Sequence, residues 1–167
     1  MKNKITIYTD GAARGNPGPA GWSAVILFLQ NNKMNIKNKK LKVIEIGGAY
    51  KHATNNQMEL TASVKALEYL KENLFKEDLG KDLKIEIFSD SKYVILGITE
   101  WIHNWIKNNL RNTAKKPVLN CELWKNLYEL AKEFQIKWNY VEGHSGDKYN
   151  DRADEIATFY ADKNKIK

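Results

Sequence analysis

The sequence is poor in the features that mark secreted, membrane-bound and disordered proteins. Its single cysteine, Cys121, cannot form an internal disulfide, which fits a reducing compartment, so we expect a cytoplasmic protein. No run of about 18 apolar residues is present, so we expect no membrane span. Residues 1–4 lead directly into a strand pattern rather than into an apolar signal segment.

Internal repeats, low-complexity stretches and linker-like segments are also absent. At 167 residues with 43% hydrophobic content, the chain is expected to form one domain over residues 1–167 with a sizeable core. We expect it to act as a monomer, although the sequence does not fix the oligomeric state. The net charge of +7 is compatible with a polyanionic partner but does not identify one.

Alternating and periodic apolar residues predict an α/β domain. Strands are expected over residues 4–11, 21–28, 41–50, 83–90 and 136–141. Helices are expected over residues 54–73, 91–99, 100–109 and 120–134, and from near residue 150 onward. A strand, a helix and a strand in succession most simply form a parallel pair with a right-handed crossover. Gly47 and Gly48 predict a bend or bulge in the third strand.

Two of the predicted strands end in an aspartate. Asp10 closes the first strand before a loop rich in glycine and proline, and Asp90 closes the fourth. If these strands are neighbours, both carboxylates lie at the carboxyl ends of the strands, where open α/β sheets bind ligands. Aspartate is also common at strand ends and in turns for structural reasons, so neither residue alone identifies a site.

Two further acids, Glu59 and Asp154, head stripes of small residues on predicted helices. Stabilisation of a helix start is the structural alternative for both. Gathered at one sheet edge, the four carboxylates would repel one another and raise one another's pKa values unless cations were bound. Oxygen ligands favour Mg²⁺ or Mn²⁺ over zinc, and two such ions can support hydrolysis of a phosphodiester.

A segment without acids, residues 101–120, combines aromatic and basic side chains. Trp101 and Trp105 are four residues apart and share a helix face, where they either belong to the core or form a surface for nucleic acid. The basic residues are His103, Lys107, Arg111, Lys115 and Lys116. Further along, His144 lies in a polar loop next to Gly143, where it is free to meet a substrate.

Six stretches together resemble ribonuclease H of the bacterial HI type, in order and in spacing. They are residues 8–11 (YTDG) with 15–19 (GNPGP), 54–60 (TNNQMEL), 89–94 (SDSKYV), 101–105 (WIHNW), 143–146 (GHSG) and 150–154 (NDRAD). The resemblance implies a ribonuclease H-like fold, a five-stranded mixed sheet flanked by helices. It also implies an endonuclease that hydrolyses the RNA strand of RNA–DNA hybrids by a two-metal-ion mechanism, leaving 5′-phosphate and 3′-hydroxyl ends.

The resemblance assigns roles residue by residue. Asp10, Glu59, Asp90 and Asp154 match the family's catalytic, metal-binding carboxylates, with Mg²⁺ as the cofactor and Mn²⁺ as a substitute. His144 matches its mobile catalytic histidine, which assists proton transfer or product release.

Other positions match contacts to the hybrid. Asn16, Asn55 and Asn56 match positions that touch its backbone and minor groove, and Gly11 suits close approach to a sugar. The region from residue 101 to 117 resembles the basic protrusion that grips the DNA strand. The contacts expected there are Trp101, Trp105, Lys107, Arg111, Lys115 and Lys116.

The sequence departs from the family pattern at three places. Lys92, expected to contact the hybrid, stands where many relatives carry glutamine. Leu110 replaces a tryptophan of a familiar bacterial member. The lysine-rich connection over residues 30–42 is longer than usual and is either a basic patch or a solvated loop. Three alternatives stay open, namely another phosphodiester nuclease of this fold, a non-catalytic nucleic-acid-binding module and a plain α/β domain with capping acids.

Overall fold

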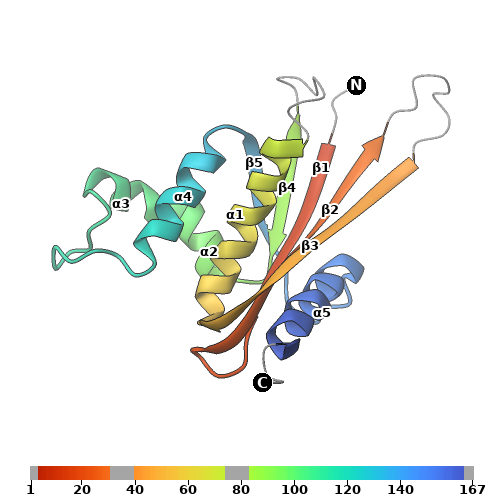
Figure 1. The fold of residues 1–167 in the computed structure, drawn as a ribbon. Helices are drawn as coiled ribbons and strands as arrows, with labels where there is room; N and C mark the ends of the chain where they lie inside the picture. The colour runs from red at the N-terminus through yellow and green to blue at the C-terminus, as the bar shows by residue number, and fades with distance from the viewer. Residues whose placement is uncertain (1–3, 31–39, 74–82, 164–167) are drawn as a thin grey trace.

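The computed structural model describes residues 4–30, 40–73 and 83–163. Its centre is a five-stranded sheet in the order β3-β2-β1-β4-β5, with helices on both faces (Figure 1). The strands are β1 (Lys4–Ala13), β2 (Gly18–Gln30), β3 (Lys40–Ala53), β4 (Lys84–Ser89) and β5 (Gln135–Tyr140). The helices are α1 (Asn55–Asn73), α2 (Lys92–Leu96), the π-helical segment η2 (Gly97–Trp101), α3 (Ile102–Lys107), α4 (Cys121–Ala131) and α5 (Lys148–Lys163).

The sheet is mixed, as the family resemblance predicts. β2 runs antiparallel to both β1 and β3, whereas β4 runs parallel to both β1 and β5. The register of the parallel pair opposes Thr9 to Ser89, so Asp10 and Asp90 follow at the same edge of the sheet. The predicted neighbouring of these two strands is therefore confirmed.

Helix α1 begins at a reciprocal cap that the sequence encodes. The Thr54 hydroxyl accepts a hydrogen bond from the Gln57 backbone N–H at 3.1 Å, and the Gln57 side-chain carbonyl accepts one from the Thr54 N–H at 2.8 Å. Such a capping box satisfies two backbone donors that would otherwise lack partners. It fixes the start of α1 and hence the position of Glu59 in its first turns.

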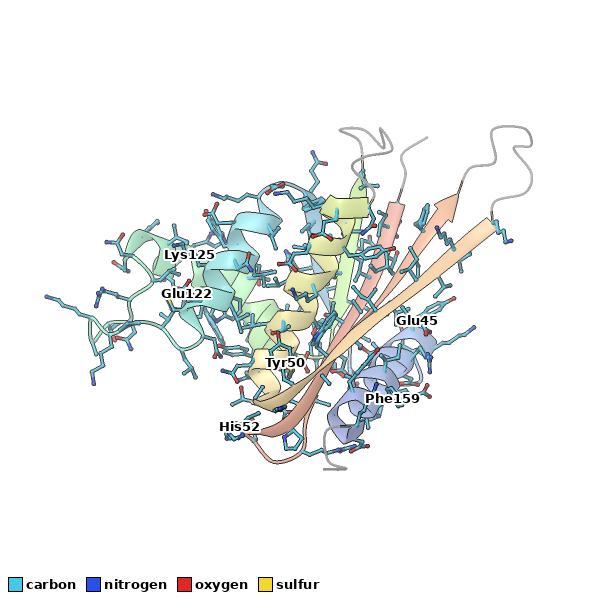
Figure 2. All side chains as sticks on the ribbon, viewed as in Figure 1. Glu45, Tyr50, His52, Glu122, Lys125 and Phe159 are labelled. Carbon is cyan, nitrogen blue, oxygen red and sulfur yellow. The ribbon has the colours of Figure 1, made fainter. Side chains whose placement is uncertain are left out.

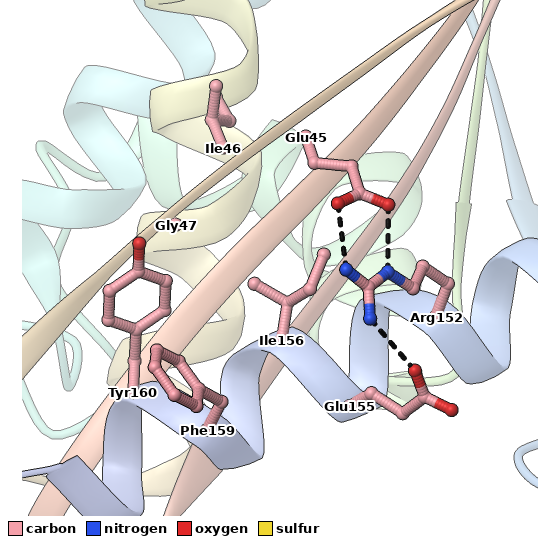
Figure 3. A pocket seen from close by; sticks show the side chains of 8 residues that line it. All are labelled: Glu45, Ile46, Gly47, Arg152, Glu155, Ile156, Phe159 and Tyr160. Carbon is pink, nitrogen blue, oxygen red and sulfur yellow. Dashed lines mark hydrogen bonds and ion pairs between the residues drawn. The ribbon is translucent and has the colours of Figure 1, made fainter.

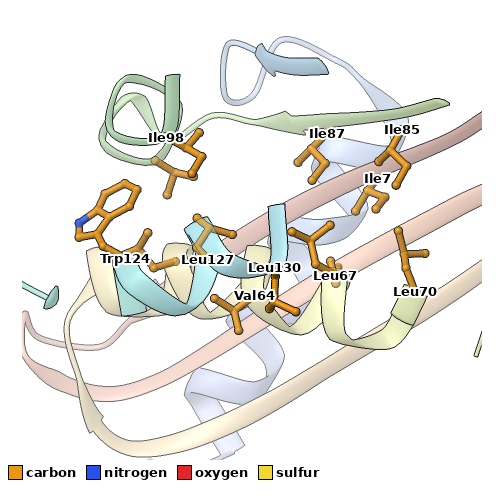
Figure 4. Close-up of a cluster of buried hydrophobic side chains, with 14 of the residues drawn as sticks. Ile7, Val64, Leu67, Leu70, Ile85, Ile87, Ile98, Trp124, Leu127 and Leu130 are labelled. Atoms are coloured by element: carbon orange, nitrogen blue, oxygen red, sulfur yellow. The ribbon is translucent and has the colours of Figure 1, made fainter. Parts of the chain in front are cut away.

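The main hydrophobic core fills the space between the sheet and the helices α1 and α4 (Figure 4). Ile7 of β1 and Ile87 of β4 are fully buried there, together with Leu67 of α1 and Leu127 of α4. Trp124 of α4 is fully buried as well, and its indole N–H donates to the Tyr93 hydroxyl at 3.0 Å. The alternation along β1 and β4 thus provides the apolar face on which α1 rests.

Helix α5 packs alone against the opposite face, over β1, β2 and β3. The approach is close because Gly21 lies directly against the α5 backbone, where a Cβ would overlap the Ala157 carbonyl. Two arginines tie the helix to the sheet and to the loop after β1. Arg152 forms a two-pronged ion pair with Glu45 of β3 (Figure 3), and Arg14 forms another with Asp162.

The prediction of a bend or bulge at Gly47 and Gly48 is wrong. The pairing of β2 with β3 is continuous through both residues, and the shift in register lies near Gly18 instead. Both glycines are required by neighbouring rings, because a Cβ on Gly47 would meet Tyr160 and one on Gly48 would meet Trp22.

The segments over residues 91–109 and 30–42 differ in what the structure shows of them. The two helices expected over residues 91–109 form α2, η2 and α3, with a π-helical segment joining the α-helices. The connection over residues 30–42 lies largely outside the described residues, and β3 begins at Lys40. In the described ranges, none of the helices has the length and apolar character needed to cross a membrane.

The position of Leu67 makes it a test of the core. We expect Leu67→Ala to lower the free energy of unfolding by about 2–5 kcal/mol, because it removes a fully buried side chain and leaves a cavity. Leu119 is 76% exposed, so Leu119→Ala is the matched control and should change stability by less than about 0.5 kcal/mol. Urea denaturation of the three proteins measures both effects, and equal losses would contradict this account of the core.

Candidate active site

Three carboxylates meet at the edge where β1 and β4 end. One oxygen each from Asp10, Glu59 and Asp90 lies within 4.8 Å of the other two. Asp10 and Glu59 are buried, and Asp90 is partly exposed. They come from β1, α1 and the residue after β4, so segments far apart in the sequence build this site.

The packing of α1 against β1 brings Glu59 to the two aspartates. Gly11 lies directly against the α1 backbone, and a Cβ at this position would overlap Met58 and Glu59. Only glycine permits this approach. Gly11 also donates its backbone N–H to the Asp10 carboxylate at 2.8 Å, which holds that side chain in place.

The crowding of these acids changes their protonation. Burial raises the pKa of Asp10 to about 8, and the charges of Asp90 and Asp154 add to this shift, while the hydrogen bonds from Glu59 and Gly11 oppose it. Burial and the Asp10 charge raise the pKa of Glu59 well above its usual range. The pKa of Asp90 is raised as well, mainly by burial, against the opposing effect of a hydrogen bond from Asn150. The arrangement therefore favours protons or cations at this edge.

The donor set fits a hard divalent cation. All of the ligand atoms are carboxylate oxygens, which suit Mg²⁺ or Mn²⁺. The Oε2 atom of Glu59 is buried, and no described group forms a hydrogen bond with it. A buried acceptor without a partner is costly, and a cation would satisfy it and offset the repulsion among the three acids.

The fourth predicted acid, Asp154, does not join the group of three. It lies on α5 and is partly exposed. Its charge raises the pKa of both Asp10 and Asp90, so it acts on the same site from the side of α5. The structure thus brings three of the four predicted carboxylates into direct reach of one ion and places the fourth beside them.

Two residues that position Asp90 were missed in the sequence. Asn150 is buried and donates its side-chain amide to Asp90 Oδ2 at 3.4 Å. Gly143 leaves room for the same oxygen, because a Cβ there would lie 2.9 Å from it. Asn150 stands four residues before Asp154 on α5, so helical spacing was a usable signal, whereas nothing in the sequence links Gly143 to Asp90.

His144 occupies the exposed loop between β5 and α5, as predicted. Its backbone has a φ of 56°, in the left-handed region, which turns the chain sharply between Gly143 and Gly146. The charge of His144 lowers the pKa of Asp90, which shows that the ring lies within electrostatic reach of the acids.

Four of the predicted contacts to a substrate are exposed, namely Asn16, Asn55, Asn56 and Lys92. Asn55 and Asn56 begin α1, and Asn16 accepts the Asn55 backbone N–H at 3.0 Å through its side-chain oxygen. Lys92 opens α2 two residues after Asp90, and its ammonium lies 5.5 Å from the centre of the Tyr140 ring. All four residues therefore lie near the acids. Gly11, which was also predicted to approach the substrate, must be a glycine because α1 packs closely against it.

The predicted basic protrusion extends away from the sheet between α3 and α4 (Figure 1). Trp105 is half-buried against Trp124, and Trp101 is 37% exposed and lies 5.8 Å from Trp105 between ring centres, so the pair spans core and surface. A bridge between Arg111 and Pro117 closes the protrusion. Its basic side chains are exposed, namely Lys107, Arg111, Lys115 and Lys116.

A groove between β3 and α5 is separate from the group of acids (Figure 3). It has a volume of about 360 Å³. Its lining residues are Glu45, Ile46, Gly47, Arg152, Glu155, Ile156, Phe159 and Tyr160. None of the four predicted carboxylates is among them.

Comparison with known proteins agrees with this geometry. The family described as RNase H matches residues 2–161. The chain is 47% identical over 161 residues to the ribonuclease H of Ruthia magnifica subsp. Calyptogena magnifica, covering 96% of this chain and 97% of that protein. It is 43% identical over 157 residues to the ribonuclease HI of Rickettsia conorii, covering 94% of this chain and 90% of that protein.

Solved structures share the fold. LC9-RNase H1, a type 1 RNase H with the type 2 active-site motif, matches with a TM-score of 0.82 and 20% identity, over 98% of this chain and 74% of that one. LC11-RNase H1 in complex with RNA/DNA hybrid matches with a TM-score of 0.64 and 27% identity, over 95% of this chain and 97% of that one. The chain therefore belongs to the ribonuclease H family of endoribonucleases.

Proposed function

We propose that this protein hydrolyses the RNA strand of RNA–DNA hybrids by a two-metal-ion mechanism, leaving 5′-phosphate and 3′-hydroxyl ends. The observation that carries the proposal is the convergence of Asp10, Glu59 and Asp90 within 4.8 Å in a member of the ribonuclease H family. A relative with the same fold has been crystallised with an RNA/DNA hybrid. In this proposal the protein acts as a monomeric single domain in the cytoplasm.

Each side chain of the site has a definite task in this proposal. Asp10, Glu59, Asp90 and Asp154 would hold Mg²⁺, with Mn²⁺ as a substitute. When bound, the metal supplies Lewis-acid stabilisation of the reacting phosphate and lowers the pKa of its water. Asn150 orients Asp90, because its amide donates to the carboxylate oxygen.

His144 moves protons at the rim of the site. Its loop is exposed, so the imidazole meets solvent and substrate alike. Such a group accepts or gives a proton near the cleaved bond without being a metal ligand. We assign it to proton transfer or product release.

Substrate recognition uses the surfaces on both sides of the acids. A protein distinguishes RNA from DNA by the 2′-hydroxyl, which is reached across the wide minor groove of an A-like duplex. Asn16, Asn55 and Asn56 supply amide groups next to the site, with Gly11 close by. The protrusion supplies charges for the phosphates of the DNA strand, and Lys92, at the start of α2, is a further contact.

We expect Asp10→Asn to abolish cleavage of an end-labelled hybrid while leaving hybrid binding largely intact, because it removes a metal ligand and keeps the basic surface. The assay is run with Mg²⁺ and with chelator, and double-stranded DNA and RNA serve as substrate controls. Glu122→Gln, an exposed change on α4 (Figure 2), should retain full activity.

The outcomes of this assay separate the competing functions. Cutting of the RNA strand alone, and only with metal, agrees with the proposal. Binding of the hybrid by the unaltered protein without cutting, in both Mg²⁺ and Mn²⁺, would replace the proposed enzyme by a binding module. Full activity of Asp10→Asn would remove that residue from the site.

The raised pKa of Asp10 predicts a pH dependence of stability. In the unfolded chain an aspartate has a pKa near 3.9, against about 8 in the fold. The folded state therefore binds more protons between these values, so the metal-free protein should lose stability as the pH rises from about 4 to about 8. Urea unfolding in chelator should show a shallower decline for Asp10→Asn. Stability that rises over this range would contradict the assignment.

The protrusion predicts a defined salt dependence. Lys115→Gln combined with Lys116→Gln should weaken hybrid binding and lower the slope of log affinity against log salt by about 1.8, since each lost phosphate contact contributes about 0.9. The control is Lys125→Gln with Lys132→Gln, which removes the same charge from exposed positions outside the protrusion. Equal slopes for the two variants would rule out direct phosphate contacts by Lys115 and Lys116.

A further inference from the structure

Half of one sheet face is left open by α5. This helix packs over β1, β2 and β3 (Figure 1). On the same face, β4 and β5 present Lys84, Gln135 and Lys137 to solvent. Further along β4 from Lys84, the side chains of Glu86 and Phe88 are partly exposed. None of these residues belongs to the group of acids at the active site.

The charges on this open face are not balanced. Lys4 lies directly opposite Lys84 on the neighbouring strand, and like charges in this position destabilise a sheet. Among the described residues, Glu86 is the acid beside these lysines, and it forms its ion pair with Lys4 at 2.8 Å. Lys84 and Lys137 both lower the pKa of Glu86, yet neither reaches a carboxylate within 4 Å in the part of the chain that the structure describes.

A groove runs between Lys84 and Lys137, neither of which has a carboxylate within 4 Å among the described residues. It has a volume of about 480 Å³ and follows the first half of β4 and β5. The polar side chains along it are Lys84, Glu86, Gln135 and Lys137. Two ammonium groups and one amide, all of them hydrogen-bond donors, therefore line a groove whose one acid is already paired with Lys4. This donor set suits an anion with several oxygens, such as a phosphate.

The groove is connected to the catalytic edge along β4. Asp90 directly follows this strand, and the six residues from Lys84 to Ser89 span about 17 Å. Midway between them, Phe88 stacks on Tyr8 with ring centres 5.1 Å apart, and Asn139 lies opposite Phe88 on β5. An aromatic ring and an amide thus separate the acids from the lysines.

We propose that the open face of β4 and β5 is a binding track for a single-stranded nucleic-acid extension that continues beyond the hybrid held at the active site. Lys84 and Lys137 bind its phosphates, and Phe88 and Asn139 contact its bases or sugars. This proposal rests on the proposed function, because the extension belongs to the same substrate.

The observations favour a single strand over a duplex. Bases in a single strand are free to lie flat against an aromatic ring, whereas the bases of a duplex are stacked on one another and expose only their edges in the grooves. The track offers one aromatic ring with lysines at its far end, a combination typical of surfaces that bind single strands without reading sequence. A substrate with an unpaired tail would therefore gain contacts that a blunt hybrid lacks.

The test compares two ligands and two matched variants. The ligands are a short blunt hybrid and the same hybrid with a single-stranded DNA tail, placed in turn at each of the four strand ends. Fluorescence anisotropy in an Asp10→Asn background measures binding without cleavage. Lys84→Gln with Lys137→Gln should weaken binding of at least one tailed hybrid and lower its salt slope by about 1.4, at about 0.7 per single-strand phosphate. Binding of the blunt hybrid should not change.

The control is again Lys125→Gln with Lys132→Gln, which should affect tailed and blunt hybrids alike. No loss with any tail, or an equal loss with blunt and tailed hybrids, would overturn the track. A free single-stranded oligonucleotide is measured in parallel, so the two lysines can be judged even if the unaltered protein fails to cleave a hybrid. Failure of cleavage would count against the proposed function and not against the track.

Discussion

The repulsion among three carboxylates held within 4.8 Å of one another is the constraint on which this structure depends. Buried like charges at such distances destabilise a folded chain unless protons or cations join them. The parallel pairing of β1 with β4 brings Asp10 next to Asp90, and the close approach of α1 at Gly11 brings Glu59 to both. Stability is thus given up at one edge of the sheet, as is common at catalytic sites, and the large core under α1 and α4 offsets the loss.

The anchoring of α5 shows how the fourth acid is supported. Its two ion pairs, Arg14 with Asp162 and Arg152 with Glu45, are largely exposed, and exposed pairs contribute little to stability. The close contact at Gly21 and the buried alanines of the helix hold it more firmly. Packing rather than charge therefore sets the position from which Asp154 acts on Asp10 and Asp90.

Much of the fold was predictable because its elements carry strong local patterns. The alternation in β1 and β4 and the acid at the end of each strand predicted where Asp10 and Asp90 meet, and the helical spacing in α1 placed Glu59 on the inner side. The resemblance to the family added the mixed sheet and the roles of the residues. The bulge predicted at Gly47 was wrong, because the sequence alone cannot distinguish a glycine in a bulge from one that makes room for a ring such as that of Tyr160. Gly143 was missed because its clearance for Asp90 arises only when distant segments are folded together.

The π-helical segment η2 has a consequence for how this region tolerates change. It joins α2 to α3 with one more residue per turn than an α-helix needs, and Gly97 at its start lies so close to the Trp124 ring that no Cβ would fit. Because a π-helix closes its hydrogen bonds over five residues where an α-helix uses four, η2 takes up one residue more than a continuous α-helix would. Loss of that residue would let α2 and α3 continue as one α-helix, with the protrusion facing nearly the same way. A residue added within α2 would instead rotate Trp101, Trp105 and the protrusion by about 100°. The effect of a change in length here therefore depends on whether it falls in the π-helical segment or in the α-helical turns before it.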